Sequence, residues 1–141
     1  MVAWPIEHAT PSVLIADDND RWRNAVGDVL SRAGFHTLEA ASGEEAIQVI
    51  RTEWIDVLLI DLQMPRLDGI QTLRIIRRER RWVPAVLMTA RPEALPAAEV
   101  RALRIHSVIH KPADRRIIVT TITSVVQRPL PPEPADGEQQ E

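Results

Sequence analysis

The sequence contains no cysteine. Disulfide frameworks, thiolate metal sites and cysteine nucleophiles are therefore excluded, and a metal ion would have to be held by oxygen or imidazole ligands. Glycine is also scarce, and the five glycines never approach the Gly-x-Gly-x-x-Gly spacing of a dinucleotide-binding loop. Long apolar runs are missing as well, since stretches such as 57–60 fall far short of the ~20 residues that span a bilayer. A flavin or dinucleotide enzyme and a membrane-spanning protein are both disfavoured.

The 141 residues suit one ordinary domain, because typical domains contain roughly 100–200 residues. Hydrophobic residues make up 45% and charged residues 26%, which is typical of a globular protein. The formal net charge of -3 provides no general attraction to nucleic acid or to anionic lipid, so neither is expected as a partner. Residues 1–11 contain Glu7 and lack a basic stretch before an apolar one, so we predict no secretory signal and a cytoplasmic protein.

Three segments are predicted along the chain. Residues 1–11 form an N-terminal extension, residues 12–127 form the folded domain, and residues 128–141 form a proline-rich acidic tail. The tail has no apolar periodicity, so it cannot build a core and is expected to be disordered. Its two overlapping Pro-x-x-Pro spacings leave a second interpretation open, in which the tail binds a proline-recognising partner.

Short apolar runs alternate with stretches of helical period inside residues 12–127, which predicts strand-helix units around a parallel sheet. The predicted strands are 13–16, 35–40, 57–60, 85–88 and 107–110. The first and last predicted helices are 22–33 and 117–126. Of the three helices between them, the first is capped by Ser42, with Glu45 completing a capping box, the second starts near Gly69, and the third starts around Pro92. The last segment is ambiguous, because nine of its ten residues are β-branched and favour a strand. Its apolar residues keep helical spacing, however, so we predict a helix.

The unusual polar residues all fall at the carboxyl ends of predicted strands. These residues are Asp17 and Asp18, Asp61, Thr89 and Lys111. In a parallel sheet, these strand ends meet at one edge, where ligands bind. Three carboxylates in one cleft repel one another unless a cation offsets their charge, and oxygen ligands suit Mg²⁺. The sequence therefore predicts a magnesium site near Lys111, which is the single lysine of the chain.

Five short motifs occur in order along the chain: Asp17-Asp18, Asp61 followed by Met64-Pro65, Asp68-Gly69, Thr89-Ala90 and Lys111-Pro112. With these motifs, residues 12–127 resemble the receiver domain of two-component response regulators. The resemblance implies an α/β, flavodoxin-like (βα)5 three-layer sandwich, with a parallel five-stranded sheet in the order 2-1-3-4-5.

The same resemblance implies a role for each site residue. Asp61 would be the phosphoacceptor, taking a phosphoryl group from a histidine kinase or a histidine phosphotransfer protein. Asp18, Asp61 and the backbone carbonyl of Gln63 would bind Mg²⁺ directly, and Asp17 would act through water. Thr89 and Lys111 would bind phosphoryl oxygens, and the peptide bond after Lys111 would be cis.

The resemblance also implies how the domain would act. No enzymatic activity is expected beyond its own phosphorylation and dephosphorylation. It would signal by binding another protein whose identity the sequence does not specify, and homodimerisation on phosphorylation is left open.

The chain departs from the family pattern in two places, at Val108 and before the fifth strand, and two variable positions of the family also bear on the site. Val108 stands three residues before Lys111, where the family has an aromatic residue that moves inward on phosphorylation. A valine has no ring to swing, so the coupling from Thr89 to the outer face is expected to differ. Gln63 and Arg91 occupy the variable positions that in the family set how fast the phosphoryl group is lost to water. The glycine-alanine pair common before the fifth strand is absent.

Several alternatives stay open at this point. Val108 favours a second function, a receiver-like binding module that works without phosphorylation. A phosphatase of the haloacid dehalogenase kind is disfavoured, because Gln63 stands where such enzymes have a second acid. Trp22 lies on the apolar stripe of the first helix and fits core packing or partner docking. The arginines before Trp82 fit either a solvated helix end or contact with nucleic acid or an acidic partner.

Overall fold

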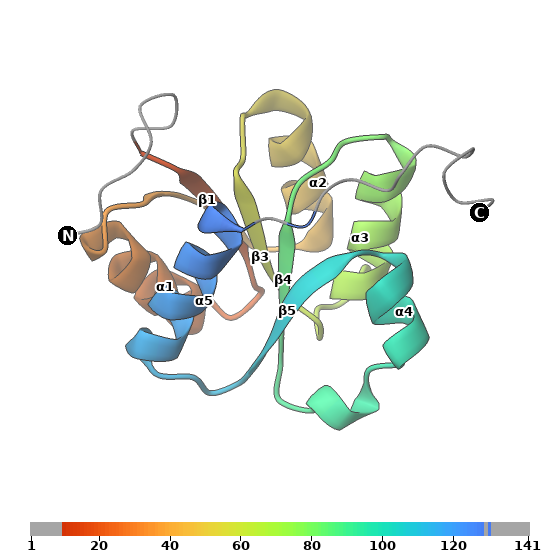
Figure 1. Ribbon diagram of the computed structural model, residues 1–141. Helices are drawn as coiled ribbons and strands as arrows, with labels where there is room; N and C mark the ends of the chain where they lie inside the picture. Colours follow the sequence, from red (N-terminus) through yellow and green to blue (C-terminus); the bar gives the residue numbers. More distant parts are fainter. Residues whose placement is uncertain (1–9, 129, 131–141) are drawn as a thin grey trace.

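The computed structural model describes residues 10–128 and 130. Strands and helices alternate along this part of the chain (Figure 1). The strands are β1 (Ser12–Ala16), β2 (His36–Ala40), β3 (Val57–Asp61), β4 (Ala85–Thr89) and β5 (Ile105–His110). The helices are α1 (Asp20–Arg32), α2 (Gly43–Thr52), α3 (Gly69–Arg78), the short 3₁₀-helix η2 (Pro92–Ala94), α4 (Ala97–Ala102) and α5 (Arg115–Gln127). The predicted alternation of strand and helix is confirmed.

The strands form one parallel sheet in the order β2-β1-β3-β4-β5, as expected. Helices α1 and α5 cover one face of the sheet, and α2, α3 and α4 cover the other (Figure 1). Alternate residues of β3 enter the two cores: Val57 and Leu59 face α1 and α5, whereas Leu58 and Ile60 face α2 and α3. Because both faces of this strand are buried, its residues from Val57 to Ile60 are all aliphatic, and only Asp61 at its end is polar.

Helices α1, α2, α3 and α5 each begin at a side chain that accepts a hydrogen bond from the backbone amide three residues later. These caps are Asn19, Ser42, Asp68 and Asp114. Each cap satisfies an amide that the helix leaves without a partner. The Ser42 cap confirms the prediction, but the Glu45 carboxylate accepts from the amide of Ala41, one residue before the partner that the predicted capping box requires.

The fourth helical segment differs from the predicted helix starting around Pro92. Residues Pro92–Ala94 form a single 3₁₀ turn, and α4 begins only at Ala97. Pro96 explains the interruption, because proline disfavours helical backbone in the residue before it. Leu95 is accordingly extended, with φ -83° and ψ 125°.

The β-branched segment 117–126 is helical and lies within α5, as predicted. Ile118, Ile122 and Val125 are buried on the face of the sheet that α1 also covers. Packing of an amphipathic face contributes more to helix stability than intrinsic propensity does, and it outweighs the β preference of these side chains.

Strand β5 begins at Ile105, two residues earlier than predicted, and its start is irregular. Ala85 pairs with Ile105 but Val86 pairs with Ser107, so His106 is an extra residue in the ladder. Just before the strand, Arg104 has a φ of 56°, in the left-handed region that favours glycine. The chain makes this turn without the glycine-alanine pair that is common in the family.

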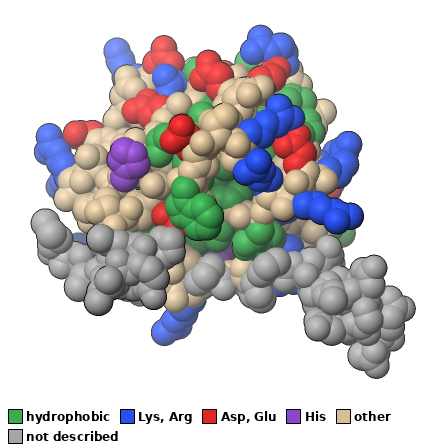
Figure 2. All heavy atoms as spheres, turned by 90° about the horizontal axis from the view of Figure 1, so that it is seen from above, with side chains coloured by type: hydrophobic (Ala, Val, Ile, Leu, Met, Phe, Trp, Pro, Cys, Tyr) green, Lys and Arg blue, Asp and Glu red, His purple; other side chains and the backbone are tan. Residues whose placement is uncertain are grey.

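Two of the arginines near the end of α3 make contacts within the domain. Arg74 pairs with Glu99 of α4 at 2.6 Å, and Arg77 donates to the backbone carbonyl of Leu103 while lying 4.2 Å from the centre of the Trp82 ring. Basic side chains gather on the right of Figure 2, the side on which α3 and α4 lie in Figure 1, with acidic side chains among them. Arg74 and Arg77 thus join α3 to its neighbours, and the two interpretations of the other arginines stay open.

The predicted extension (residues 1–11) and tail (residues 128–141) fall mostly outside the described residues, so their boundaries stay predictions. Within the described part of the chain, every helix is too short or too polar to cross a membrane.

Candidate functional site

The carboxyl-terminal edge of the sheet contains a cavity of about 650 Å³. It is lined by Asp17, Asp18, Asn19, Trp22, Asp61, Gln63, Ala90, Lys111 and Pro112. Asp17 follows β1, Asp61 ends β3 and Lys111 follows β5. Because these strands run parallel, their ends meet at the same edge, and the structure brings together the acidic residues and the lysine that the sequence placed there.

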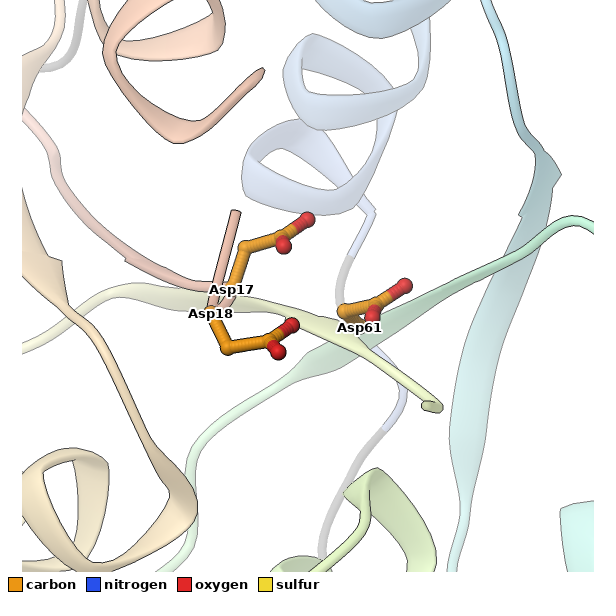
Figure 3. Close-up of side chains that lie close together, drawn as sticks. All are labelled: Asp17, Asp18 and Asp61. Atoms are coloured by element: carbon orange, nitrogen blue, oxygen red, sulfur yellow. The ribbon is translucent and has the colours of Figure 1, made fainter. Parts of the chain in front are cut away.

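Asp17, Asp18 and Asp61 form a cluster of carboxylates. Figure 3 shows them side by side at the ends of β1 and β3, with their carboxylates pointing the same way. One oxygen from each lies within 4.8 Å of the others. Asp17 is fully buried and Asp61 is 3% exposed, whereas Asp18 is open to solvent. Such a set of oxygen donors suits a hard cation.

Lys111 supplies positive charge to this cluster. Its Nζ donates to Asp17 Oδ2 at 2.9 Å and to Asp61 Oδ1 at 3.2 Å. Burial by itself would lower the pKa of Lys111, but the hydrogen bond to Asp17 and the charges of both carboxylates outweigh it, so the pKa is raised. Lys111 therefore stays protonated at neutral pH. The peptide bond between Lys111 and Pro112 is cis, as the family resemblance implied.

Asp61 is unusually hard to ionise. Burial raises its pKa most, the charge of Asp17 raises it further, and Lys111 offsets only part of this, so the pKa rises from 3.8 to about 6. A carboxyl group with a raised pKa binds its proton more tightly in the folded protein than in the unfolded chain. Ionisation of Asp61 therefore lowers the free energy of unfolding, and this loss of stability grows as the pH rises from 3.8 to about 6. At pH 7 the loss is complete.

Asn19 ties the Asp17 carboxylate to the start of α1. The Asn19 amide donates to Asp17 Oδ1 at 2.9 Å, and the Asn19 side chain accepts from the amide of Trp22 at 2.9 Å. Asn19 was not among the site residues predicted from the sequence. Its position in the sequence could have indicated a helix cap, because asparagine is a preferred residue just before the first turn of a helix.

Arg23 is a second residue that the sequence analysis missed. Its Nη1 donates to the backbone carbonyl of Asp17 at 2.7 Å, and its guanidinium forms ion pairs with Asp20 and with Glu39 of β2. These contacts hold the β1–α1 loop against the neighbouring strand. Only the pair with Asp20, three residues before Arg23 on the same helix, has a spacing that a local pattern predicts. The pair with Glu39 joins a helix to a separate strand, so no local pattern predicts it.

Thr89 is fully buried at the end of β4, and its hydroxyl is already hydrogen-bonded. It donates to Gln63 Oε1 at 3.3 Å and accepts from the amide of Arg91 at 3.0 Å. Gln63 lines the cavity, whereas the Arg91 side chain is exposed and lies outside the lining. The Thr89 hydroxyl would have to leave Gln63 before it could donate a hydrogen bond to a ligand. The predicted influence of Gln63 and Arg91 on phosphoryl loss stays a prediction.

Two other residues singled out in the sequence take different positions. Val108 lies on β5 with 37% of its surface exposed, on the outer side of the strand. Its effect on coupling to Thr89 stays a prediction. Trp22 is half-buried: it packs against the core shared by α1 and α5, and it also lines the cavity beside Lys111.

Gly69 allows α3 to start close to the end of β3. A Cβ atom at this position would lie 2.7 Å from the backbone oxygen of Asp61 and 3.0 Å from the Cα of Leu62. Backbone atoms cannot move aside as a flexible side chain can, so a larger residue would displace Asp61 itself. The Asp68-Gly69 motif thereby combines a helix cap with close packing against the site.

Comparison with known proteins agrees with this geometry. The family model described as the response regulator receiver domain matches residues 13–123. The transcriptional regulatory protein AfsQ1 of Streptomyces coelicolor is 30% identical over 118 residues, which cover 84% of this chain and 52% of that protein. The alkaline phosphatase synthesis transcriptional regulatory protein PhoP of Bacillus subtilis is 26% identical over 116 residues, which cover 82% of this chain and 48% of that protein. The chain spans about half the length of these curated relatives.

Solved receiver domains have the same fold. The receiver domain of the Francisella response regulator 1452 superposes with a TM-score of 0.78 at 28% identity, covering 84% of this chain and 98% of that one. Chemotaxis protein CheY4 of Vibrio cholerae superposes with a TM-score of 0.74 at 27% identity, covering 86% of this chain and all of that one (100%). Since the family model spans nearly the whole folded unit, with its sheet order and acidic cluster, the chain belongs to the response regulator receiver domain family.

Proposed function

We propose that this receiver domain takes a phosphoryl group onto Asp61 from the phosphohistidine of a histidine kinase or a histidine phosphotransfer protein. The observation that carries the proposal is the setting of Asp61. Its carboxylate lies 3.2 Å from the Lys111 ammonium, lines the cavity, and has an oxygen within 4.8 Å of an oxygen of Asp17 and of Asp18. The proposed nucleophile, a cation and a set of possible metal ligands thus lie close together in one site.

The proposed transfer makes one bond and breaks one. An Asp61 carboxylate oxygen forms the bond to phosphorus, the bond from phosphorus to the donor imidazole nitrogen breaks, and its electron pair stays on that nitrogen. Lys111 would bind one phosphoryl oxygen, and the Thr89 hydroxyl would bind another after leaving Gln63. Phosphoryl transfer depends mainly on positioning and charge neutralisation, so these contacts are the main contribution of the chain.

We propose Mg²⁺ as the ion of this site. Its donors would be the Asp18 and Asp61 carboxylates and the Gln63 backbone carbonyl, with Asp17 acting through water. The raised pKa of Asp61 fits this assignment, because burial and the charge of Asp17 disfavour the ionised carboxylate and Lys111 offsets only part of this, so a bound cation would stabilise the ionised form. When bound, the ion offsets charge that would repel the incoming phosphoryl group. A protein of this fold, the response regulator TrrA of Thermotoga maritima, has a crystal structure in complex with Mg(2+)-BeF.

Mg²⁺ binding is expected to weaken below pH 6. Protons compete with the ion for the Asp61 carboxylate, whose pKa is about 6. We expect the apparent dissociation constant, measured by calorimetric titration, to rise by up to about tenfold for each pH unit below this pKa, and to level off above about pH 7.5. The Asp61→Asn variant should bind Mg²⁺ more weakly, and its dissociation constant should not change with pH in this way. An affinity that does not change between pH 5 and pH 7 would contradict the assignment.

Intact-mass spectrometry after incubation with acetyl phosphate tests the proposal directly. We expect the mass of one phosphoryl group to be added in the presence of Mg²⁺ and none after the ion is removed with a chelator. If the small donor fails, a phosphorylated histidine kinase is used in its place. Failure with both donors would refute the proposal.

Failure with both donors would favour the second candidate function, a receiver-like module that binds its partner without phosphorylation. Val108 is the observation that supports it, because it is exposed on β5 and has no ring to move inward. The intact acidic cluster and Lys111 favour the first candidate.

The output is proposed to be binding of another protein in the cytoplasm. AfsQ1 and PhoP are named transcriptional regulatory proteins, but this chain matches only about half of each. The activity of those whole proteins is therefore not carried over to this chain.

A further inference from the structure

We infer that Trp22 is a positioning residue for Lys111, and that its indole ring keeps the ammonium at the cavity. The centre of the ring lies 5.3 Å from Lys111 Nζ, within the roughly 6 Å at which a cation and an aromatic face attract one another. Both residues line the cavity that contains Asp61. The inference rests on the proposed function, because it assigns Trp22 a part in the proposed phosphoryl transfer.

Core packing alone does not account for a tryptophan at this position. The ring does pack against the core shared by α1 and α5. Its Nε1, however, is buried and has no hydrogen-bond partner among the described residues. An unpaired buried donor is unfavourable, whereas a leucine or a methionine would fill an apolar space without one. Attraction to the neighbouring cation gives the indole an advantage that these smaller residues lack.

The start of α1 holds this ring in a fixed place relative to the acidic cluster. The amide of Trp22 donates to the Asn19 side chain, and the amide of Asn19 donates to the Asp17 carboxylate. The same turn of chain therefore positions both a carboxylate partner of Lys111 and the aromatic ring beside it.

The Trp22 ring is uncharged, whereas the hydrogen-bond partners of Lys111 are negatively charged. These partners are the carboxylates of Asp17 and Asp61, which are also proposed to interact with Mg²⁺. Positive charge near a carboxylate weakens its attraction for the ammonium. An aromatic face carries no formal charge and is no ligand for a hard cation. We therefore expect the contact between Trp22 and Lys111 to persist when Mg²⁺ is present.

One resonance reports on this contact, because Lys111 is the only lysine in the sequence. In protein labelled with carbon-13 at lysine Cε, we expect the ring current of Trp22 to shift the signal of the attached protons, with and without Mg²⁺. The displacement should be lost in Trp22→Leu and kept in part in Trp22→Phe. If the Lys111 signal is the same in Trp22→Leu as in the wild type, the inference is wrong.

Trp82→Leu is the matched control for this measurement. Trp82 also lies beside a cation, with its ring centre 4.2 Å from the Arg77 guanidinium, but it precedes β4 and so lies at the opposite end of that strand from the site. Its replacement should leave the Lys111 signal unchanged.

The kinetic consequence is measured as the rate of phosphorylation by acetyl phosphate with Mg²⁺. Trp22→Leu should lower this rate by about two- to fivefold, the size expected for a partly exposed contact between a cation and a ring, and Trp22→Phe should restore most of it. In a Lys111→Met background the same change should have no further effect, because the ring acts through the ammonium. If Trp22→Leu slows phosphorylation by the same factor in the Lys111→Met background as in the wild type, this part of the inference is wrong.

Folding and function are controlled separately. Thermal unfolding is measured first, and if Trp22→Leu does not fold, Trp22→Met replaces it in both experiments, since methionine fills irregular space. If the wild type has the ring-current displacement but takes no phosphoryl group, the proposed function fails and the contact stands. If the wild type is phosphorylated without the displacement, the contact fails and the function stands.

Discussion

The Asp61→Asn variant should take up no phosphoryl group and yet unfold at a higher temperature than the wild-type protein at pH 7. The amide keeps the size of the side chain but is no nucleophile, so covalent capture stops. The stability gain follows from the pKa of about 6, because at pH 7 burial and Asp17 oppose the ionised Asp61. Removing this charge should raise the free energy of unfolding by about 1–3 kcal/mol, since one pKa unit corresponds to about 1.4 kcal/mol and the raised pKa already includes the attraction of Lys111.

Calorimetric unfolding without divalent ions checks this result. The difference between Asp61→Asn and the wild type should shrink as the pH falls from about 6 and vanish below 3.8, where Asp61 is protonated in both the folded protein and the unfolded chain. The control is Asp28→Asn, because Asp28 is an exposed residue of α1 paired only at the surface with Arg32, and its replacement should change little. An Asp61→Asn variant that is less stable than the wild type at pH 7 would disprove the physical account of the site.

Replacement of Lys111 by methionine should lower stability, in contrast to Asp61→Asn. The Lys111 side chain is 19% exposed and bridges two carboxylates that are almost fully buried. Without this cation and without Mg²⁺, the free energy of unfolding at pH 7.5 should fall by about 2–3 kcal/mol, less than for a fully buried pair because Lys111 retains some solvent contact. Phosphorylation should slow on the order of a hundredfold, because a preorganised charge at the phosphoryl group is lost.

Urea unfolding at two pH values separates charge from packing in Lys111→Met. The loss of stability should shrink at pH 5, where Asp61 is largely protonated, and on addition of Mg²⁺. Lys111→Arg is the matched control: it retains the charge and most of the stability, but its planar guanidinium does not reproduce the compact ammonium, so phosphorylation should still be slow. An equal loss at every pH, with or without Mg²⁺, would assign the effect to packing alone.

Local patterns were sufficient to predict most of the fold. The aliphatic run 57–60 indicated a strand buried on both faces, and the helical spacing of Ile118, Ile122 and Val125 correctly overrode their β preference. The one clear error in a helix, around Pro92, came from considering the proline at the start of the segment without the second proline at Pro96.

The sequence by itself determined the order of strands and helices and the identity of the residues at the strand ends. Both depend on short-range periodicity and covalent order, and parallel strands then bring their ends to one edge. Only the tertiary structure decided that Trp22 lies beside Lys111, that Arg23 holds the carbonyl of Asp17, and that the pKa of Asp61 is raised. The first and the last of these properties depend on burial and on distances between residues far apart in the chain, such as Lys111 and Asp61, which are 50 positions apart. The contact of Arg23 spans only 6 positions, but it depends on how the β1–α1 loop folds, which no local pattern specifies.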